Sequence, residues 1–141
     1  MTVNALITGG AGFIGSHIVE TLREAGFRVS VLDDLSRGQR AHVPADVTLH
    51  HVDICDQGAV EAVVRAERPE VILHQAARAD VRESFAVPHL YLNVNVTGTL
   101  NILEAARRWG GAQGDLCLDR RGDLRRRRSA AHPGDRPHLA A

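Results

Sequence analysis

The 141-residue sequence predicts an α/β fold with a doubly wound parallel sheet. Short apolar runs, typical of strands buried on both faces, alternate with longer segments whose apolar residues recur at helical spacing. A glycine-rich turn joins the first run to the first helical segment, as in sheets of this class. The length suits one domain with a sizeable core, since two domains of ordinary size need about twice as many residues.

The first forty residues predict a strand, a helix and a second strand. Residues 5–8, with Val3 just upstream, form a short apolar run that ends in glycines and predicts the first strand. Apolar residues recur at helical spacing from Phe13, and Gly26 stands where a C-terminal cap belongs, which predicts a helix of about three turns. Residues 28–32 are rich in β-branched side chains and predict the second strand, which a polar loop follows through residue 40.

Residues 47–109 continue the alternation. We expect a third strand at residues 47–52, and a helix that begins at Asp56 and ends near the Arg68-Pro69 pair. A fourth strand at residues 71–74 and a loop over residues 75–87 come next, and Pro88 then suits the start of a long helix that runs to Trp109. The predicted doubly wound sheet is therefore truncated after the fourth strand and the helix that follows it, which leaves the fourth strand at an edge.

The turn between the first strand and the first helix has glycines at positions 9, 12 and 15. Gly9 permits a tight turn, Gly12 lets the backbone approach a pyrophosphate, and Gly15 allows the helix to pack closely on the strand. The helix that starts at Phe13 presents free N–H groups and a positive dipole end to phosphates. This context predicts an NAD-binding Rossmann fold; a glycine-rich turn without a ligand is the alternative.

Asp33 follows the second strand, where an acidic side chain can accept hydrogen bonds from both hydroxyls of the adenosine ribose. A carboxylate at this position would repel the 2′-phosphate of NADP, so the residue favours NAD. Arg37 lies close by in the sequence and keeps NADP open as a second possibility.

The composition excludes several classes of function. The formal net charge is zero, which gives no general attraction to nucleic acid or to an anionic membrane. Cys55 and Cys117 form no C-x-x-C pair, and His50-His51 would point to opposite faces of a strand, so no metal site is predicted. The sequence has neither a signal peptide pattern nor an apolar run long enough to cross a membrane, and we expect a cytoplasmic protein.

Five motifs in order resemble the NAD-dependent epimerase/dehydratase family of extended short-chain dehydrogenases, and most of all UDP-glucose 4-epimerases. They are TGGAGFIG at residues 8–15, LDDLS at 32–36, VDI at 52–54, HQAA at 74–77 and NVTGT at 95–99. The resemblance covers residues 3 to about 109, which is the N-terminal part of such an enzyme. It implies NAD as the cofactor, a nucleotide-sugar substrate for the full-length parent, and a homodimer of that parent.

The resemblance also assigns roles to individual residues. It places Phe13 and Ile14 at the pyrophosphate, Asp33, Asp34 and Ser36 at the adenosine ribose and its surroundings, Asp53 and Ile54 at the adenine, and Gln75, Ala76 and Ala77 at the nicotinamide. Asn95 would support the last of these segments from the long helix. Two of these roles have alternatives: Asp53 could cap the following helix, and Asn95 could be a satisfied core amide.

The family's catalytic groups are missing from this sequence. The resemblance implies a tyrosine that accepts a sugar hydroxyl proton, a lysine four residues later, and a serine or threonine after the fifth strand. Tyr91, the only tyrosine, is followed four residues later by Asn95, and the chain has no lysine. We therefore assign no catalytic residue, and we expect a truncated, inactive member of the family; an NAD-binding module without catalysis is the alternative.

Residues 111–141 differ in character from the rest of the chain. Arginines outnumber aspartates there and no apolar period persists, so we expect a basic, disordered tail next to a partial Rossmann domain at residues 1–110. A permitted set of codons for residues 112–125, read one nucleotide later, encodes RKVIYASTGGAIYG, which resembles the fifth strand and the serine/threonine turn of the family. We interpret the tail as an out-of-frame peptide rather than as a nucleic-acid-binding arm, which would need aromatic residues for base stacking.

Overall fold

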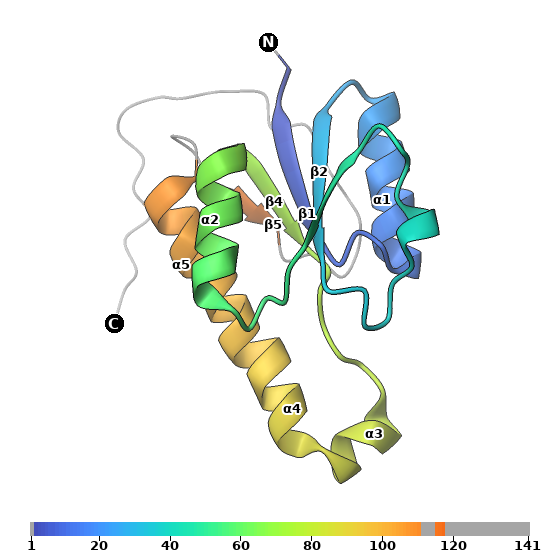
Figure 1. The fold of residues 1–141 in the computed structure, drawn as a ribbon, viewed down its shortest axis with the longest axis vertical. Helices are drawn as coiled ribbons and strands as arrows, with labels where there is room; N and C mark the ends of the chain where they lie inside the picture. The colour runs from blue at the N-terminus through green and yellow to red at the C-terminus, as the bar shows by residue number, and fades with distance from the viewer. Residues whose placement is uncertain (1, 111–114, 118–141) are drawn as a thin grey trace, which may run out of the picture.

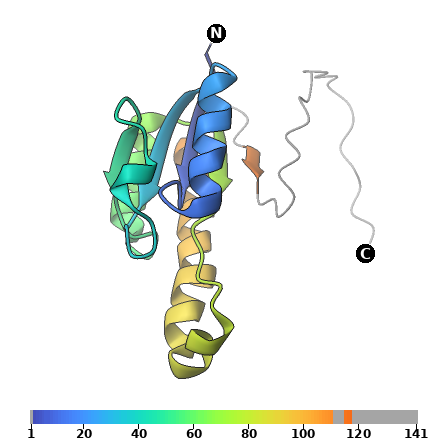
Figure 2. The same cartoon turned by 90° about the vertical axis from the view of Figure 1, so that its right-hand side faces the viewer.

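The computed structural model describes residues 2–110 and 115–117, which form a parallel sheet with helices on both faces (Figures 1 and 2). The strand order is β3-β2-β1-β4-β5 and every neighbouring pair is parallel. This arrangement confirms the predicted doubly wound α/β class. The four predicted strands are β1 (Asn4–Thr8), β2 (Arg28–Asp33), β3 (Thr48–His51) and β4 (Val71–His74).

A fifth strand extends the four that the sequence predicts. Strand β5 (Asp115–Cys117) pairs in parallel with residues 71–73 of β4. For these residues, the expectations of an open edge at β4 and of a disordered tail are therefore corrected. The sequence pattern did not predict β5 because a three-residue segment that begins with an aspartate has no apolar period; pairing with a neighbouring strand decides its conformation. The rest of the predicted tail, at 111–114 and 118–141, lies outside the described residues.

Helices cover the two faces of the sheet unequally (Figure 2). Helix α1 (Phe13–Glu24) packs its buried Val19 and Leu22 against one face, together with Ile7 of β1. Helices α2 (Gln57–Glu67) and α5 (Thr99–Trp109) cover the other face, where Leu6 of β1 is buried. Leu6 and Ile7 are both completely buried, because successive side chains of a central strand point to opposite faces that are both covered.

Two left-handed residues end the first two helices. Gly26 follows α1 with φ +83° and donates its N–H to the carbonyl of Arg23, which confirms the predicted cap. Arg68 ends α2 with φ 45°, just before Pro69, at the position where the sequence predicts the helix to stop. At the start of α2, the Asp56 side chain accepts a hydrogen bond from Ala59 N at 3.0 Å.

The segment from residue 75 to residue 109 differs from its prediction in two respects. A short helix, α3 (Val81–Ala86), forms inside the predicted loop, where the Asp80 side chain caps it. The predicted long helix consists of α4 (Pro88–Leu92), the π-helical turn η2 (Asn93–Gly98) and α5 in succession. Helices α3 and α4 extend past the carboxyl ends of the strands (Figure 1). Wider turns of this kind are frequent at functional sites, and η2 carries Asn95.

Candidate functional site

A pocket lies at the carboxyl ends of the central strands, where the segments after β1, β2, β3 and β4 converge. Ligands of doubly wound sheets bind at the carboxyl ends of the strands, at the point where the order of the strands in the sheet reverses. Most of the residues predicted for the site line the pocket, namely Gly9, Gly12, Asp33, Asp34, Ser36, Asp53, Ile54, Gln75, Ala76 and Ala77. The other four, Phe13, Ile14, Gly15 and Asn95, lie outside the lining.

The glycine turn has the shape that the sequence predicts. Gly9 has φ +71° and donates its N–H to the carbonyl of Leu32 at 2.8 Å, which joins the end of β1 to β2. A Cβ at Gly9 would lie 2.7 Å from the backbone N of Ala76, and a Cβ at Gly15 would overlap the carbonyl oxygen of Gly9. Gly15 therefore packs α1 against the turn itself, which refines the predicted contact with the strand. The backbone fills the space that side chains would need.

The first turn of α1 faces outward beside the pocket. Phe13 and Ile14 are 79% and 63% exposed, which is unusual for apolar residues of this size. Gly12 precedes them and offers no side-chain hydrogen bond to the N–H groups of the turn. These groups and the positive end of the helix dipole are therefore available to an anion such as a phosphate.

Asp33 has a structural role that the sequence does not reveal. Its carboxylate is buried, and Oδ2 accepts a hydrogen bond from Ala11 N at 2.9 Å while Oδ1 accepts one from Leu35 N at 2.8 Å. The side chain thus connects the glycine turn to the loop that follows β2. Each carboxylate oxygen accepts more than one hydrogen bond, so Asp33 retains acceptor capacity toward the pocket.

The two other predicted aspartates shape their own loops. Asp34 Oδ1 accepts hydrogen bonds from N and Oγ of Ser36 at 2.9 and 2.6 Å, which closes the loop after β2. Asp53 Oδ1 accepts one from Cys55 N at 2.8 Å. The alternative that Asp53 caps α2 is wrong, because Asp56 holds that position.

Ile54 is held against the start of α5. Its side chain is buried against Gly98, where a Cβ would lie 2.5 Å from Ile54 Cδ1, and Asn101 Nδ2 donates to the Ile54 carbonyl at 2.9 Å. These contacts fix the loop after β3 at the pocket. The sequence places Ile54 in a motif, but its partners lie more than forty residues away in the chain.

Asn95 supports the segment after β4, as the resemblance implies. Its Oδ1 accepts a hydrogen bond from Arg78 N and its Nδ2 donates to Arg78 O, both at 2.8 Å. The amide is satisfied, as the alternative states, but it is half-buried and bound to this loop rather than placed in the core. The paired bonds attach the loop to η2.

A hydrogen-bond chain through His74 was missed by the sequence analysis. Thr99 Oγ1 donates to Asn95 O at 2.7 Å and lies 2.9 Å from His74 Nε2, so Nε2 carries the proton and donates to Thr99. His74 Nδ1 then accepts from Thr8 Oγ1 at 2.6 Å, and Thr8 Oγ1 accepts from the backbone N–H groups of Gln75 and Ala76. The chain connects β1, β4 and α5 behind the pocket. The polar His74 at the end of an apolar strand was the only signal in the sequence.

The His74 chain predicts that the protein loses stability in acid. Burial lowers the pKa of His74 from 6.5, so the unfolded chain takes up a proton at a higher pH than the folded chain. The free energy of unfolding therefore falls as the pH drops from about 6.5 through the lower folded pKa, and this contribution is constant above that range. Urea unfolding at several pH values measures the slope. The His74→Gln variant keeps one donor and one acceptor, and should lose the part of the slope that His74 causes; an unchanged slope would contradict the assignment.

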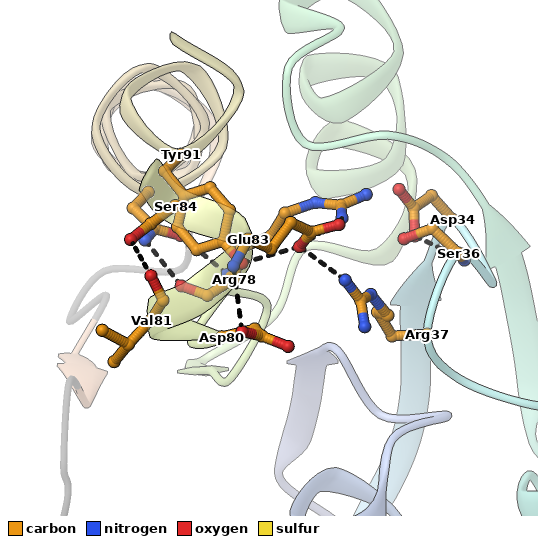
Figure 3. A network of polar contacts seen from close by, with 10 residues as sticks. Asp34, Ser36, Arg37, Arg78, Asp80, Val81, Glu83, Ser84 and Tyr91 are labelled. Atoms are coloured by element: carbon orange, nitrogen blue, oxygen red, sulfur yellow. Dashed lines mark hydrogen bonds and ion pairs between the residues drawn. The ribbon is translucent and has the colours of Figure 1, made fainter. Parts of the chain in front are cut away.

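Other pocket residues lie outside the predicted set. Leu32, Arg37, Gly38, Val52, Arg78 and Val94 also line the pocket. The sequence does offer a signal for Gly38, which is a glycine in the loop after Asp33. The structure gives the reason for it: a Cβ there would lie 2.8 Å from the carbonyl carbon of Ala11. The two arginines come from different loops, and both contact the Glu83 carboxylate (Figure 3).

The described part of the chain offers neither a metal cluster nor a membrane-spanning helix. Within residues 2–110 and 115–117, no three His, Cys, Asp or Glu side chains come together in a way that could hold a metal ion. Among the helices of these residues, none combines the length and the apolar character needed to cross a membrane.

Comparison with known proteins gives concordant results. The family model described as "NAD dependent epimerase/dehydratase family" matches residues 5–114. The UDP-glucose 4-epimerase of Streptomyces lividans is 44% identical over 108 residues, which cover 76% of this chain and 33% of that protein. The UDP-glucose 4-epimerase of Bacillus subtilis is 36% identical over 112 residues, with 74% and 33% covered.

Solved structures show the same relationship. UDP-glucose 4-epimerase of Thermus thermophilus in complex with NAD has a TM-score of 0.74 and 48% identity, and the match covers 76% of this chain and 34% of that one. The enzyme of Thermotoga maritima with UDP-glucose has a TM-score of 0.74 and 38% identity, with 77% and 35% covered. The chain spans about a third of the length of these relatives.

Proposed function

Because this chain belongs to the NAD-dependent epimerase/dehydratase family, we propose that residues 1–110 are the NAD-binding part of a UDP-glucose 4-epimerase-like enzyme. One observation carries the proposal: the glycine turn and the buried Asp33 carboxylate meet at the pocket between β1, β2 and β4. Beside them, the first turn of α1 has no side-chain cap, so its N–H groups remain available to a pyrophosphate.

The proposal gives each part of the pocket a portion of the cofactor. Gly9, Gly12 and the first turn of α1, with Phe13 and Ile14, hold the pyrophosphate, and Gly15 lets that turn come close. Asp33 accepts hydrogen bonds from the adenosine ribose, with Asp34 and Ser36 beside it, and Asp53 and Ile54 flank the adenine. Gln75, Ala76 and Ala77 lie along the nicotinamide, and Asn95 holds their loop in place.

The family's reaction requires groups that residues 1–141 do not supply. NAD, when bound, supplies the hydride acceptor and donor for a sugar carbon of the nucleotide-sugar substrate. A tyrosine acting as base needs a lowered pKa, whereas burial and a hydrogen bond to Glu83 raise the pKa of Tyr91. With no lysine in the sequence, we propose that these 141 residues bind NAD without catalysing epimerisation.

The tail and the cellular context complete the proposal. We interpret residues 111–141 as an out-of-frame continuation. Under this interpretation, the chain derives from a full-length parent enzyme that is active and homodimeric. The cytoplasm is the compartment we propose, because the thiol of Cys55 is free among the described residues. The second candidate is an NAD-binding module that never catalysed a reaction. Every lysine or arginine position of the chain is an arginine, which GC-rich DNA favours even when it is read in a wrong frame, so we prefer the out-of-frame derivative of an active enzyme.

Isothermal titration of the purified chain with NAD tests the proposal. We expect saturable binding at one site per chain, weaker binding of NADP, and no conversion of UDP-glucose to UDP-galactose in the same preparation. Absence of NAD binding by a chain with a cooperative thermal unfolding transition would reject the proposed cofactor site. Measurable epimerisation would instead reject the proposed inactivity.

A further inference from the structure

Glu83 bridges two arginines that line the pocket (Figure 3). Arg37 follows β2, Arg78 follows β4, and both line the pocket. Glu83 Oε2 lies 2.5 Å from Arg37 Nη2 and 3.3 Å from Arg78 Nη1, and Tyr91 Oη donates to the same oxygen at 2.6 Å. We refer to these four residues as the Glu83 cluster.

The Glu83 cluster is ordered by local structure and is ionised at neutral pH. Asp80 caps the first turn of α3 by accepting a hydrogen bond from Glu83 N at 3.1 Å, which places the Glu83 side chain between the two arginines. The hydrogen bond from Tyr91 and the charges of Arg37 and Arg78 lower the pKa of Glu83. The cluster therefore holds one carboxylate between two guanidinium groups.

Among the residues of the cluster, Arg37 is the nearest in sequence to Asp33, the residue proposed to bind the ribose. It lines the pocket together with Asp33, Asp34 and Ser36. In folds of this kind, an acidic residue at the end of the second strand selects the 2′-hydroxyl of NAD, whereas an arginine nearby accommodates the 2′-phosphate of NADP. This chain has both residue types at one site, so the state of Arg37 bears on which cofactor binds.

We propose that Glu83 is a specificity-determining residue, which engages Arg37 and so withholds its guanidinium from a 2′-phosphate. This inference rests on the proposed NAD site. A 2′-phosphate that binds Arg37 through both Nη groups would compete with the Glu83 carboxylate for Nη2, whereas a 2′-hydroxyl leaves the pair intact. The Arg37 side chain is 58% exposed, so solvent screens the pair and the expected effect is moderate.

Titration of the full chain with NAD and with NADP tests the role of Glu83. In the Glu83→Gln variant, we expect the affinity for NADP to rise by about fivefold relative to that for NAD, because the amide no longer neutralises Arg37. The gain should disappear in the Glu83→Gln/Arg37→Gln double variant and persist in Glu83→Gln/Arg78→Gln. The Tyr91→Phe variant is the matched control, since it removes a contact of Glu83 but keeps every charge, and should leave the ratio near its original value.

The single variant Arg37→Gln provides a second measurement that leaves Glu83 in place. If Glu83 withholds Arg37, this variant should bind NADP as the original chain does; a loss of NADP affinity would show that Arg37 already serves the phosphate and would overturn the inference. An unchanged cofactor ratio in Glu83→Gln, with NAD binding intact, would also overturn it and leave the proposed NAD site standing. If the original chain binds neither cofactor, the proposed function fails, and the inference fails with it.

Discussion

Replacing Gly15 with alanine is expected to destabilise the folded chain by about 3 kcal/mol and to abolish NAD binding. A Cβ at this position would overlap the carbonyl oxygen of Gly9 and lie 2.8 Å from Gly10 Cα, and both are backbone atoms of the turn. Backbone cannot move aside as a flexible side chain can, so α1 would have to shift away from the turn. The same shift would remove its first-turn N–H groups from the position proposed for the pyrophosphate.

Urea unfolding and NAD titration of the Gly15→Ala variant measure both effects. Gly58→Ala is the matched control, because Gly58 lies in the first turn of α2 and a Cβ there would make only an ordinary contact, 3.7 Å from Asp56 Oδ1. Alanine favours a helix over glycine by up to about 1 kcal/mol, so the control should be neutral or slightly stabilising. Equal stability of the two variants would show that the turn tolerates a side chain at position 15.

The Asp33→Ala variant is expected to lose about 2–4 kcal/mol of folding free energy and at least about a hundredfold in NAD affinity. The substitution removes the acceptor for two backbone donors, Ala11 N and Leu35 N, at a residue that is only 7% exposed. Unpaired buried donors are costly, and the glycine turn would no longer be tied to the loop after β2. The ribose would also lose its proposed acceptor.

Asp34→Ala is the control for the structural part of this prediction. Asp34 is exposed, and among the described residues its side chain bonds Ser36 alone, two residues along the chain, so its loss should change stability by less than about 0.5 kcal/mol. If Asp33→Ala unfolds at the same urea concentration as Asp34→Ala, the brace between turn and loop contributes nothing. If it loses stability but keeps full NAD affinity, Asp33 is a structural residue and its proposed contact with the ribose is wrong.

Local patterns account for the parts of the fold that the sequence analysis predicts. The strands at β1, β2 and β4 follow from apolar runs, and the end of α1 follows from Gly26, whose left-handed conformation suits glycine. The same patterns failed for α3 and β5. Helix α3 has no buried residue and therefore no apolar stripe to detect, and β5 consists of three residues whose conformation depends on a neighbouring strand.

The sequence by itself determined the class of the fold, the glycine turn, the acidic residue after β2 and the family, because each depends on residues close together in the chain. The tertiary structure alone decided how these parts are joined. Asp33 reaches Ala11 across 22 positions, Glu83 reaches Arg37 across 46, and His74 reaches Thr8 across 66. The physical reason is that parallel strands bring their carboxyl ends to one edge of the sheet, so residues distant in sequence become partners around one pocket.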